Sequence, residues 1–219
     1  MSKNIGSIIK WVVIVVASIL FLSLFAYLII LTKQSKSTKT TASISLSSDG
    51  QVRGNASASA TLVEFGDFQC PACKAYEPFV QKILQDEDGK VKLLFKHFPL
   101  TTIHRNAMGA AVAAEAAGLQ EKFWEMHDAL YDNQSEWADL NALGAQDKFI
   151  FYAKSLGLDV GRFTKDLEDK SLSDKVSAMQ QEGVSAGVSG TPTFFINGKL
   201  IQNPTNYEDF KSIIESNLK

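Results

Sequence analysis

The only two cysteines of the chain, Cys70 and Cys73, lie two residues apart, and this pair limits what the chain can be. A Cys-x-x-Cys pair exchanges disulfides with another dithiol, supplies half of a metal site, or forms an inert pair. The loop that it closes is too short to hold a large domain together. The residues around the pair therefore decide between these three chemistries.

A metal site lacks further ligands in this sequence. Structural zinc normally requires four Cys or His ligands. Apart from the cysteines, the chain offers only His97, His104 and His127, and their spacing is not that of a zinc finger. We therefore expect no metal and no other cofactor. His104 is expected to begin a helix, and His127 to be a structural residue within one.

The cysteine pair stands between a predicted strand and a predicted helix. Residues 61–67 form a short run that contains β-branched and aromatic residues, which is typical of a buried strand. Apolar residues then recur every three or four positions over residues 70–85 and predict an amphipathic helix. A second strand is predicted over residues 91–98. The order strand, helix, strand favours a parallel unit.

The rest of the folded region is predicted to be helical and then to return to strands. Residues 103–187 contain no convincing strand, and Asn197-Gly198 between two apolar runs predicts a hairpin. A closing helix is expected over residues 207–218. We therefore predict one α/β domain over residues 60–218 with a helical insertion at about 103–187. The helices expected in the insertion cover residues 107–117, 121–131, 145–156, 159–169 and 171–186.

The N-terminal region contains a long apolar run. Residues 11–31 carry no charge and, at about 1.5 Å per residue, are long enough to span a bilayer core. We predict an uncleaved transmembrane signal anchor, preceded by a short cytoplasmic N-terminus over residues 1–10. The alternative is a cleaved signal peptide, whose apolar region usually has about 7–15 residues. Residues 32–59 are rich in Ser, Thr, Lys, Gly and Ala and predict a flexible linker.

Charge is distributed unevenly along the chain. The first 59 residues carry six Lys or Arg and one acidic residue, whereas the remainder carries 16 basic and 23 acidic residues. This acidic balance argues against binding to nucleic acid. Lysines flank both sides of the apolar run, so they do not decide its orientation. Because dithiol chemistry suits an oxidising compartment, we expect an extracytoplasmic domain attached to the cell membrane.

The two cysteines have different predicted positions on their helix. Cys70 would lie at the helix N-terminus, where unpaired N–H groups and the helix dipole lower the pKa of a thiol. Cys73, one turn later, would point toward the core. We predict that Cys70 is the nucleophile and Cys73 the resolving thiol of a redox-active disulfide. Pro71 suits the first helical turn because it lacks a donor there.

Four motifs carry a resemblance to a known family. They are residues 63–73 (VEFGDFQCPAC), 96–100 (KHFPL), 123–128 (FWEMHD) and 187–198 (GVSGTPTFFING). Through these motifs, in this order, residues 60–218 resemble the DsbA-like thiol-disulfide oxidoreductases of the thioredoxin superfamily, of the membrane-anchored bacterial type. The resemblance implies a thioredoxin-like fold with an inserted helical domain.

The resemblance also implies a substrate-binding loop. Thr191-Pro192 corresponds to the cis-proline loop that lies beside the active-site disulfide in this family. A cis proline exposes the backbone of the residue before it, which can then pair with an extended substrate. We expect the substrate to contact Thr191, Pro192, Pro71 and Ala72.

Glu64 lies six residues before Cys70, where members of this family place a buried acidic residue. A buried carboxyl has a raised pKa and can relay the proton of Cys73. The alternative is a glutamate at a strand edge that reaches solvent.

Ala72 departs from the pattern of the strong oxidases, which often carry His between the cysteines. An imidazolium there stabilises the thiolate of the nucleophile, and alanine does not. We therefore expect a weaker oxidant than those members.

Three functions are compatible with these residues. The preferred prediction is a dithiol oxidase that introduces disulfides into secreted or surface proteins and is re-oxidised by a membrane partner. The first alternative is a reductase or isomerase that uses the same residues and is kept reduced by a membrane donor. The second is a redox-inactive chaperone or metal-delivery module. The predicted partners are cysteine-containing extracytoplasmic proteins, the membrane redox partner and, through residues 11–31, the lipid bilayer.

Overall fold

The computed structural model describes residues 11, 13–14, 16–25, 27, 43–87 and 89–218. The chain divides into two units, 1–41 and 42–219. In the first unit, the described residues are helical and expose apolar side chains. Among the residues described, no helix is long and apolar enough to cross a membrane. The predicted N-terminus over residues 1–10 lies wholly outside the described residues, and the predicted anchor over residues 11–31 lies partly outside them.

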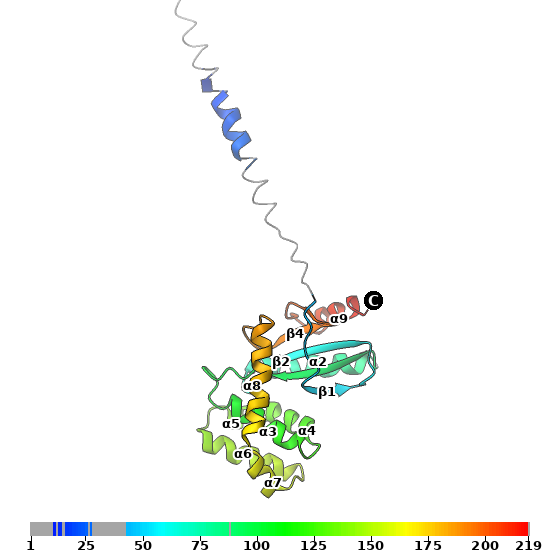
Figure 1. The fold of residues 1–219 in the computed structure, drawn as a ribbon. Coiled ribbons are helices and arrows are strands. Elements are labelled where there is room, and N and C mark those ends of the chain that lie inside the picture. The colour runs from blue at the N-terminus through cyan, green and yellow to red at the C-terminus, as the bar shows by residue number, and fades with distance from the viewer. Residues whose placement is uncertain are drawn as a thin grey trace, which may run out of the picture. The chain divides into compact units, whose positions relative to one another are not determined.

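The second unit is built around a five-stranded sheet in the order β1-β3-β2-β4-β5 (Figure 1). The central strand β2 is parallel to β3 and antiparallel to β4, and the outer strands β1 and β5 are antiparallel to their neighbours. The strands are β1 (Gln51–Gly54), β2 (Ala60–Gly66), β3 (Val91–His97), β4 (Thr193–Ile196) and β5 (Lys199–Leu200).

Helix α2 (Pro71–Asp86) connects the parallel strands β2 and β3, as the strand-helix-strand pattern predicts. The hairpin is also confirmed, because β4 and β5 pair around Asn197 and Gly198. Both turn residues have positive φ, at 50° and 77°. Asn and Gly tolerate this left-handed conformation best, which is why the dipeptide signals the turn. Helix α9 (Tyr207–Ser216) closes the domain.

The chain between β3 and β4 forms the predicted helical insertion. Ala-rich α3 is buried along most of its length, so small side chains let its neighbours approach closely. Helices α6, α7 and α8 begin at Asn141, Asp159 and Asp169, whose side chains accept hydrogen bonds from the first turn. The helices are α3 (Ala107–Gly118), α4 (Phe123–Asp132), α5 (Gln134–Trp137), α6 (Ala142–Ser155), α7 (Val160–Asp166) and α8 (Lys170–Ser185).

The sheet buries an apolar layer on each face. Side chains of β2 alternate between the two layers, so that Leu62 joins the larger core cluster with residues of α2 and α9, while Val63 and Phe65 join the smaller one. Helix α8 covers the second face. It approaches closely because Gly183 has no side chain: a Cβ there would lie 2.9 Å from the Phe65 ring.

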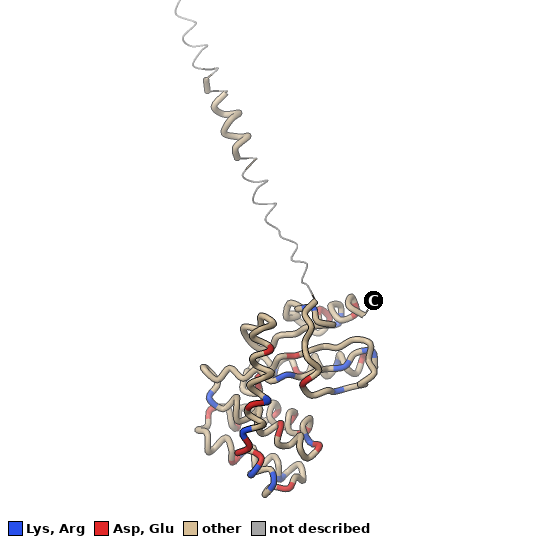
Figure 2. The backbone as a smooth tube through the Cα atoms, in the orientation of Figure 1, with Lys and Arg blue, Asp and Glu red and all other residues tan. Residues whose placement is uncertain are grey.

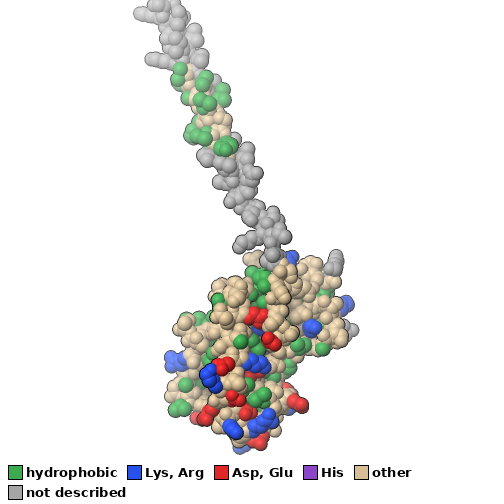
Figure 3. Space-filling model, viewed as in Figure 1, with side chains coloured by type: hydrophobic (Ala, Val, Ile, Leu, Met, Phe, Trp, Pro, Cys, Tyr) green, Lys and Arg blue, Asp and Glu red, His purple; other side chains and the backbone are tan. Residues whose placement is uncertain are grey.

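Basic and acidic residues are interspersed along the folded unit rather than separated (Figure 2). On the face shown in Figure 3, charged side chains of both signs gather over the insertion helices.

The predicted linker over residues 32–59 is wrong for residues 43–59, which belong to the folded unit. Residues 51–54 form the edge strand β1, and before it the Ile44 N–H donates to the Gly198 carbonyl at 2.7 Å. Leu46 packs against the second core cluster. The polar composition was misleading because an edge segment is held mainly by backbone and side-chain hydrogen bonds, which require few apolar residues. The domain therefore starts near residue 42 and not at 60.

A buried ion pair fastens this N-terminal segment. The Lys96 side chain is fully buried, and its Nζ lies 2.6 Å from Glu182 Oε2 and 2.9 Å from Ser47 Oγ. The Glu182 carboxylate also accepts from the Ser47 backbone N–H. One acidic side chain of α8 therefore joins the sheet to the segment before β1.

Removing the Glu182 charge should leave a buried ammonium without its counter-ion. We expect Glu182→Gln to lower the free energy of unfolding by about 3 kcal/mol, measured by urea denaturation. The control is Asp174→Asn, which breaks the exposed Lys170–Asp174 pair and should cost about 0.5 kcal/mol or less. Equal stability of the two variants would contradict a desolvated Lys96.

Candidate active site

Cys70 and Cys73 lie where the chain leaves β2 and enters α2. Cys70 is the N-cap residue of α2 in an extended conformation, and Pro71 occupies the first helical turn. Both cysteines are free thiols, with exposed fractions of 7% for Cys70 and 1% for Cys73. Pro71 and Ala72 between them are exposed. The helix start predicted from the sequence is confirmed, and Cys70 is the more exposed of the two buried cysteines.

The loop before β4 lies against Cys70, although 121 positions separate them in the sequence. The Thr191–Pro192 peptide bond is cis, and the Cys70 thiol lies 3.4 Å from the Thr191 carbonyl oxygen. Strand pairing explains the contact: Thr193 is paired with Phe65, so the residues just before β4 meet the residues just after β2. The structure thus brings together the two segments that the sequence motifs singled out.

The two thiols have opposite pKa shifts. A hydrogen bond from the Cys73 side chain lowers the pKa of Cys70 to about 5, opposed by burial and assisted by Thr191 and the backbone N–H groups of Cys73 and Ala72. Burial raises the pKa of Cys73 well above its usual value, and its hydrogen bond to Cys70 and the nearby Glu64 charge add to the effect. At neutral pH, the reduced pair therefore holds one thiolate, on Cys70, and one thiol, on Cys73.

Glu64 is buried within β2, with an exposed fraction of 1%. Because β3 and β4 flank β2, the alternative of an edge glutamate that reaches solvent is wrong. Gly66 leaves room mainly for the Phe95 ring, since a Cβ at that position would lie 2.5 Å from the ring, and 3.2 Å from Glu64 Oε1. Burial raises the pKa of Glu64 well above its usual value, and the nearby charges of Glu77 and Cys70 raise it further.

Asp67 organises the loop that leads to Cys70. Its Oδ1 accepts from the Gln69 N–H at 2.8 Å, and its Oδ2 accepts from the Leu100 N–H at 2.9 Å. The same Oδ2 lies 2.7 Å from His104 Nδ1. The prediction that His104 begins the Ala-rich helix is wrong: α3 starts at Ala107, and His104 instead holds the loop through Asp67.

Residues of the helical insertion that the sequence did not single out hold the same loop. Gln134 Nε2 donates to the carbonyls of Phe68, at 2.7 Å, and Cys70, at 3.1 Å. Gln69 Oε1 accepts from the Asn106 N–H at 2.8 Å. Gln134 lies on α5, whose four residues are too few to show a helical period. Neither amide carried a sequence signal.

Glu77, His127 and Asp128 form the one group among the described residues whose side chains offer three ligand atoms within 4.8 Å of one another. A guanidinium already supplies positive charge there, because Arg53 bonds Asp128 at 2.6 Å and Glu77 at 3.3 Å. His127 also uses Nδ1 to bond Asp128 at 2.9 Å. The atoms left over fall short of a four-ligand site, so the group is an ion-pair network that includes the buried His127 expected from the sequence.

Comparisons with known proteins agree with this geometry. The family model described as Thioredoxin matches residues 47–216. "Probable disulfide bond formation protein D" of Bacillus cereus is 34% identical over 217 residues, which cover 95% of each chain. The crystal structure of oxidised BdbD from Bacillus subtilis superposes with a TM-score of 0.68 at 26% identity, covering 81% of this chain and 97% of that one.

A second kind of relative is much longer. The Na(+)/H(+) antiporter NhaA 1 of Salinispora arenicola is 40% identical over 165 residues, which are 75% of this chain but 24% of the antiporter. The chain thus spans about a quarter of the length of the antiporters that it matches.

The chain belongs to the thioredoxin family. Its thioredoxin-like fold, inserted helices and Cys70–Cys73 pair make it a thiol-disulfide oxidoreductase of the DsbA and BdbD type.

The ionisation of Cys70 should depend mainly on Cys73. In the reduced protein, the alkylation rate of Cys70 should follow a thiolate fraction with a midpoint at about pH 5. Cys73→Ala should move this midpoint toward the ordinary thiol pKa, whereas Cys73→Ser, which keeps a donor, should move it less. An unchanged midpoint in Cys73→Ala would contradict the hydrogen bond as the main cause.

The same shift predicts how the stability of the reduced protein varies with pH. The pKa of Cys70 is lower in the folded than in the unfolded chain, so the unfolded chain binds more protons between about pH 5 and the ordinary thiol pKa. The stabilisation that the Cys70 thiolate contributes to the folded protein should therefore be greatest above the ordinary thiol pKa. It should be lost as the pH falls through about 5. Urea unfolding of reduced wild type and Cys70→Ser across this range measures the contribution, and parallel pH profiles would count against it.

Proposed function

We propose that this protein is an extracytoplasmic dithiol oxidase that transfers the Cys70–Cys73 disulfide to folding proteins. The observation that carries the direction is the lowered pKa of Cys70, at about 5. A stabilised thiolate favours the reduced form of the pair, and a pair that favours its reduced form oxidises other dithiols. The Bacillus cereus relative named for disulfide bond formation supports the same direction.

The proposed reaction moves two electrons from a substrate dithiol to the cysteine pair. A substrate thiolate attacks Cys70 Sγ, forms a mixed disulfide and displaces Cys73, which takes up a proton because its pKa is raised. A second substrate thiolate attacks the substrate sulfur of the mixed disulfide and releases Cys70 as a thiolate. Cys70 is thus the nucleophile during re-oxidation, and Cys73 is the resolving thiol.

Glu64 is the proposed proton relay for Cys73. Its burial and raised pKa support this role, because a carboxyl with a raised pKa holds its proton more firmly and can pass it to a neighbouring thiolate. A carboxylate with an ordinary pKa would be a poor donor at neutral pH.

The proposed substrate site surrounds the exposed side of Cys70. An extended peptide would pair with the backbone of Thr191, whose carbonyl already lies beside the Cys70 thiol, with Pro192 holding the loop. Pro71 and Ala72 would contact the same peptide from α2, since both are exposed.

The proposed location rests on the sequence. Residues 11–31 would anchor the protein in the cell membrane with residues 1–10 in the cytoplasm, and residues 32–41 would tether the folded unit outside. The apolar run and the oxidising compartment that dithiol oxidation requires support this arrangement. The proposed partners are extracytoplasmic proteins with reduced cysteines and a membrane protein that re-oxidises the pair.

The alanine at position 72 favours a protein of moderate oxidising strength. Reduction or isomerisation of disulfides is therefore the second candidate function. The pKa of Cys70, at about 5, lies above the value of about 3.5 known for DsbA. A less stabilised thiolate gives a less oxidising pair, and the redox partner then sets the direction.

The redox state of the pair in cells tests the direction. Acid quenching followed by alkylation should find the full-length protein mostly oxidised at Cys70 and Cys73. A mostly reduced pair would replace the oxidase with the reductase or isomerase. Cys73→Ser should accumulate mixed disulfides with extracytoplasmic proteins, and failure to trap any would favour the redox-inactive module.

Restoring a cation beside Cys70 should strengthen the oxidant. Ala72→His should lower the pKa of Cys70, and each unit of that decrease should raise the reduction potential by about 30 mV. Ala72→Leu is the matched control, because it adds bulk without charge and should leave the potential near that of the wild type. Equilibration with glutathione measures all three proteins. Equal potentials for the His and Leu variants would contradict the electrostatic explanation.

A further inference from the structure

Four buried polar atoms without a hydrogen-bond partner among the described residues gather beneath the cysteine pair. An unpaired buried polar atom costs about 1–3 kcal/mol, so a group of them on one side of a sheet requires an explanation. The four atoms are Glu64 Oε2, Glu77 Oε2, His127 Nε2 and the Tyr131 hydroxyl.

The side chains that carry these atoms lie close to Cys73 and extend from it toward α4. Cys73 and Glu77 are four residues apart on α2, so they share the helix face that is buried against the sheet. Glu64 lies on the strand below them, and its pKa is raised by charges on both Glu77 and Cys70 in addition to burial. Tyr131 on α4 borders the same space. Burial raises the pKa of its hydroxyl, and the nearby charges of Cys73, Glu64 and Glu77 raise this pKa further.

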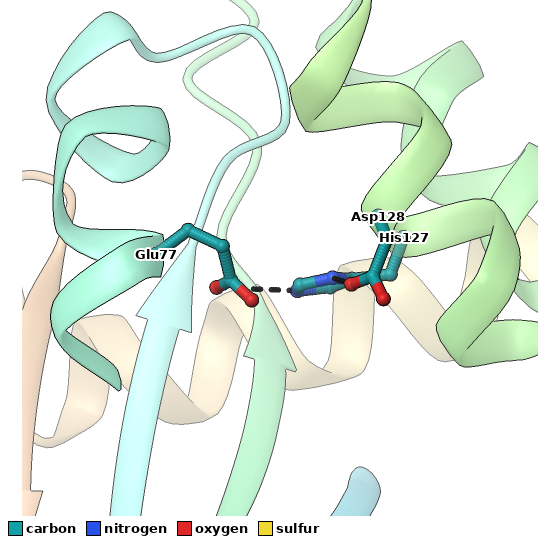
Figure 4. A group of neighbouring side chains, drawn as sticks. All are labelled: Glu77, His127 and Asp128. Atoms are coloured by element: carbon teal, nitrogen blue, oxygen red, sulfur yellow. Dashed lines mark hydrogen bonds and ion pairs between the residues drawn. The ribbon is translucent and has the colours of Figure 1, made fainter. Parts of the chain in front are cut away.

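His127 continues the series from Glu77. Figure 4 shows Glu77 reaching from α2 toward the His127 ring on α4, and His127 Nε2 lies 4.0 Å from Glu77 Oε2. The other ring nitrogen, Nδ1, lies 2.9 Å from Asp128 Oδ1. Aromatic rings hold the imidazole in place, with Phe95 and Tyr131 both at 5.0 Å between centroids. An imidazole fixed in this way can accept a proton on one nitrogen and release one from the other.

Asp128 connects the series to solvent. Its side chain is 38% exposed, whereas that of His127 is fully buried. Arg53 Nη2 bonds Asp128 Oδ2 at 2.6 Å, and the guanidinium lies over the Trp124 ring, 4.3 Å from the centroid. The carboxylate is therefore held with one oxygen on Arg53 and the other on His127.

We propose that Glu77, His127 and Asp128 form the route by which the proton of Cys73, carried by Glu64, exchanges with solvent. The inference rests on the proposed function. When Cys73 leaves as a thiolate during substrate oxidation, one proton enters from solvent beside the Asp128 carboxylate, passes through His127 to Glu77, and then moves through Glu64 to the thiolate sulfur.

Re-oxidation reverses the proton movement. The Cys70 thiolate attacks one sulfur of the oxidant's disulfide, forms a mixed disulfide with it and releases the other sulfur as a thiolate. The Cys73 thiol then gives its proton to Glu64, and the resulting thiolate attacks Cys70 Sγ and releases the thiolate of the oxidant. The titratable and charged groups that face the route are Cys70, Cys73 and Asp67 near the start of α2, Tyr131 from α4 and Arg53 from β1.

The re-oxidation step offers a direct test. Reduced full-length protein is mixed with glutathione disulfide, quenched with acid, and analysed by mass for the glutathione adduct on Cys70 and for the intramolecular disulfide. In His127→Ala, we expect the adduct to form at the wild-type rate but to resolve about a hundredfold more slowly. Imidazole in the buffer should restore the rate of resolution in proportion to its concentration, while the reduction potential stays unchanged.

Matched variants separate proton transfer from packing. His97→Ala removes another buried imidazole, one that bonds Glu115 instead of the proposed route, and its resolution rate should not respond to imidazole. His127→Gln keeps the size of the side chain and a donor to Asp128 and should resolve slowly, so it replaces His127→Ala if that variant does not fold. Wild-type resolution in either His127 variant, or a slow rate in His127→Ala without imidazole rescue, would overturn the route.

Two further outcomes are distinguishable. If wild-type protein forms no adduct on Cys70, the proposed function fails, and the route fails with it. If the adduct forms normally and His127→Ala resolves it normally, only the route fails. A chelator should leave all rates unchanged, and a rate that falls with chelator would assign the Glu77–His127 space to a bound cation and overturn the proton route.

Discussion

The antiparallel pairing of β2 with β4 determines where the chemistry of this domain can take place. Because Thr193 is paired with Phe65, the chain that enters β4 meets the chain that has just left β2. The Thr191 carbonyl then lies against the Cys70 thiol, at the N-terminus of α2. The helix start and the strand register each contribute a partner, and neither alone would place a carbonyl and helix N–H groups around one sulfur.

The same sheet separates two kinds of buried charge. On the side of α8, Lys96 is paired with Glu182, and the ion pair fixes the N-terminal segment. On the side of α2, Glu64 carries a carboxyl oxygen without a partner among the described residues. The first arrangement stabilises the fold, whereas the second destabilises it and leaves a group free to titrate. The buried charge on one face of the sheet, at Lys96, thus stabilises the fold, whereas the buried carboxyl on the other face, at Glu64, is available for proton transfer.

The features predicted from the sequence were those with a local signal. The apolar period predicted α2, and the Asn197-Gly198 dipeptide predicted the hairpin. The spacing of Cys70 and Cys73 indicated the redox site. Strand β1 and helix α5 were missed because a polar edge strand and a four-residue helix have no period to detect. Glu77 had a usable signal, since it lies one turn after Cys73, but its neighbour His127 comes from another helix. Contacts between distant elements depend on tertiary packing, which composition and spacing do not encode.

The hydrogen bond between Ile44 and Gly198 has a mechanical consequence. Gly198 follows β4, and β4 runs opposite to β2, so this bond lies at the end of the sheet away from Cys70. Tension on the chain before residue 44 would therefore load the hairpin end first and leave the geometry around the thiols unstrained. Ser43 Oγ also donates to the Asn197 carbonyl, so residues 43 and 44 are both fixed to the end of the sheet opposite Cys70.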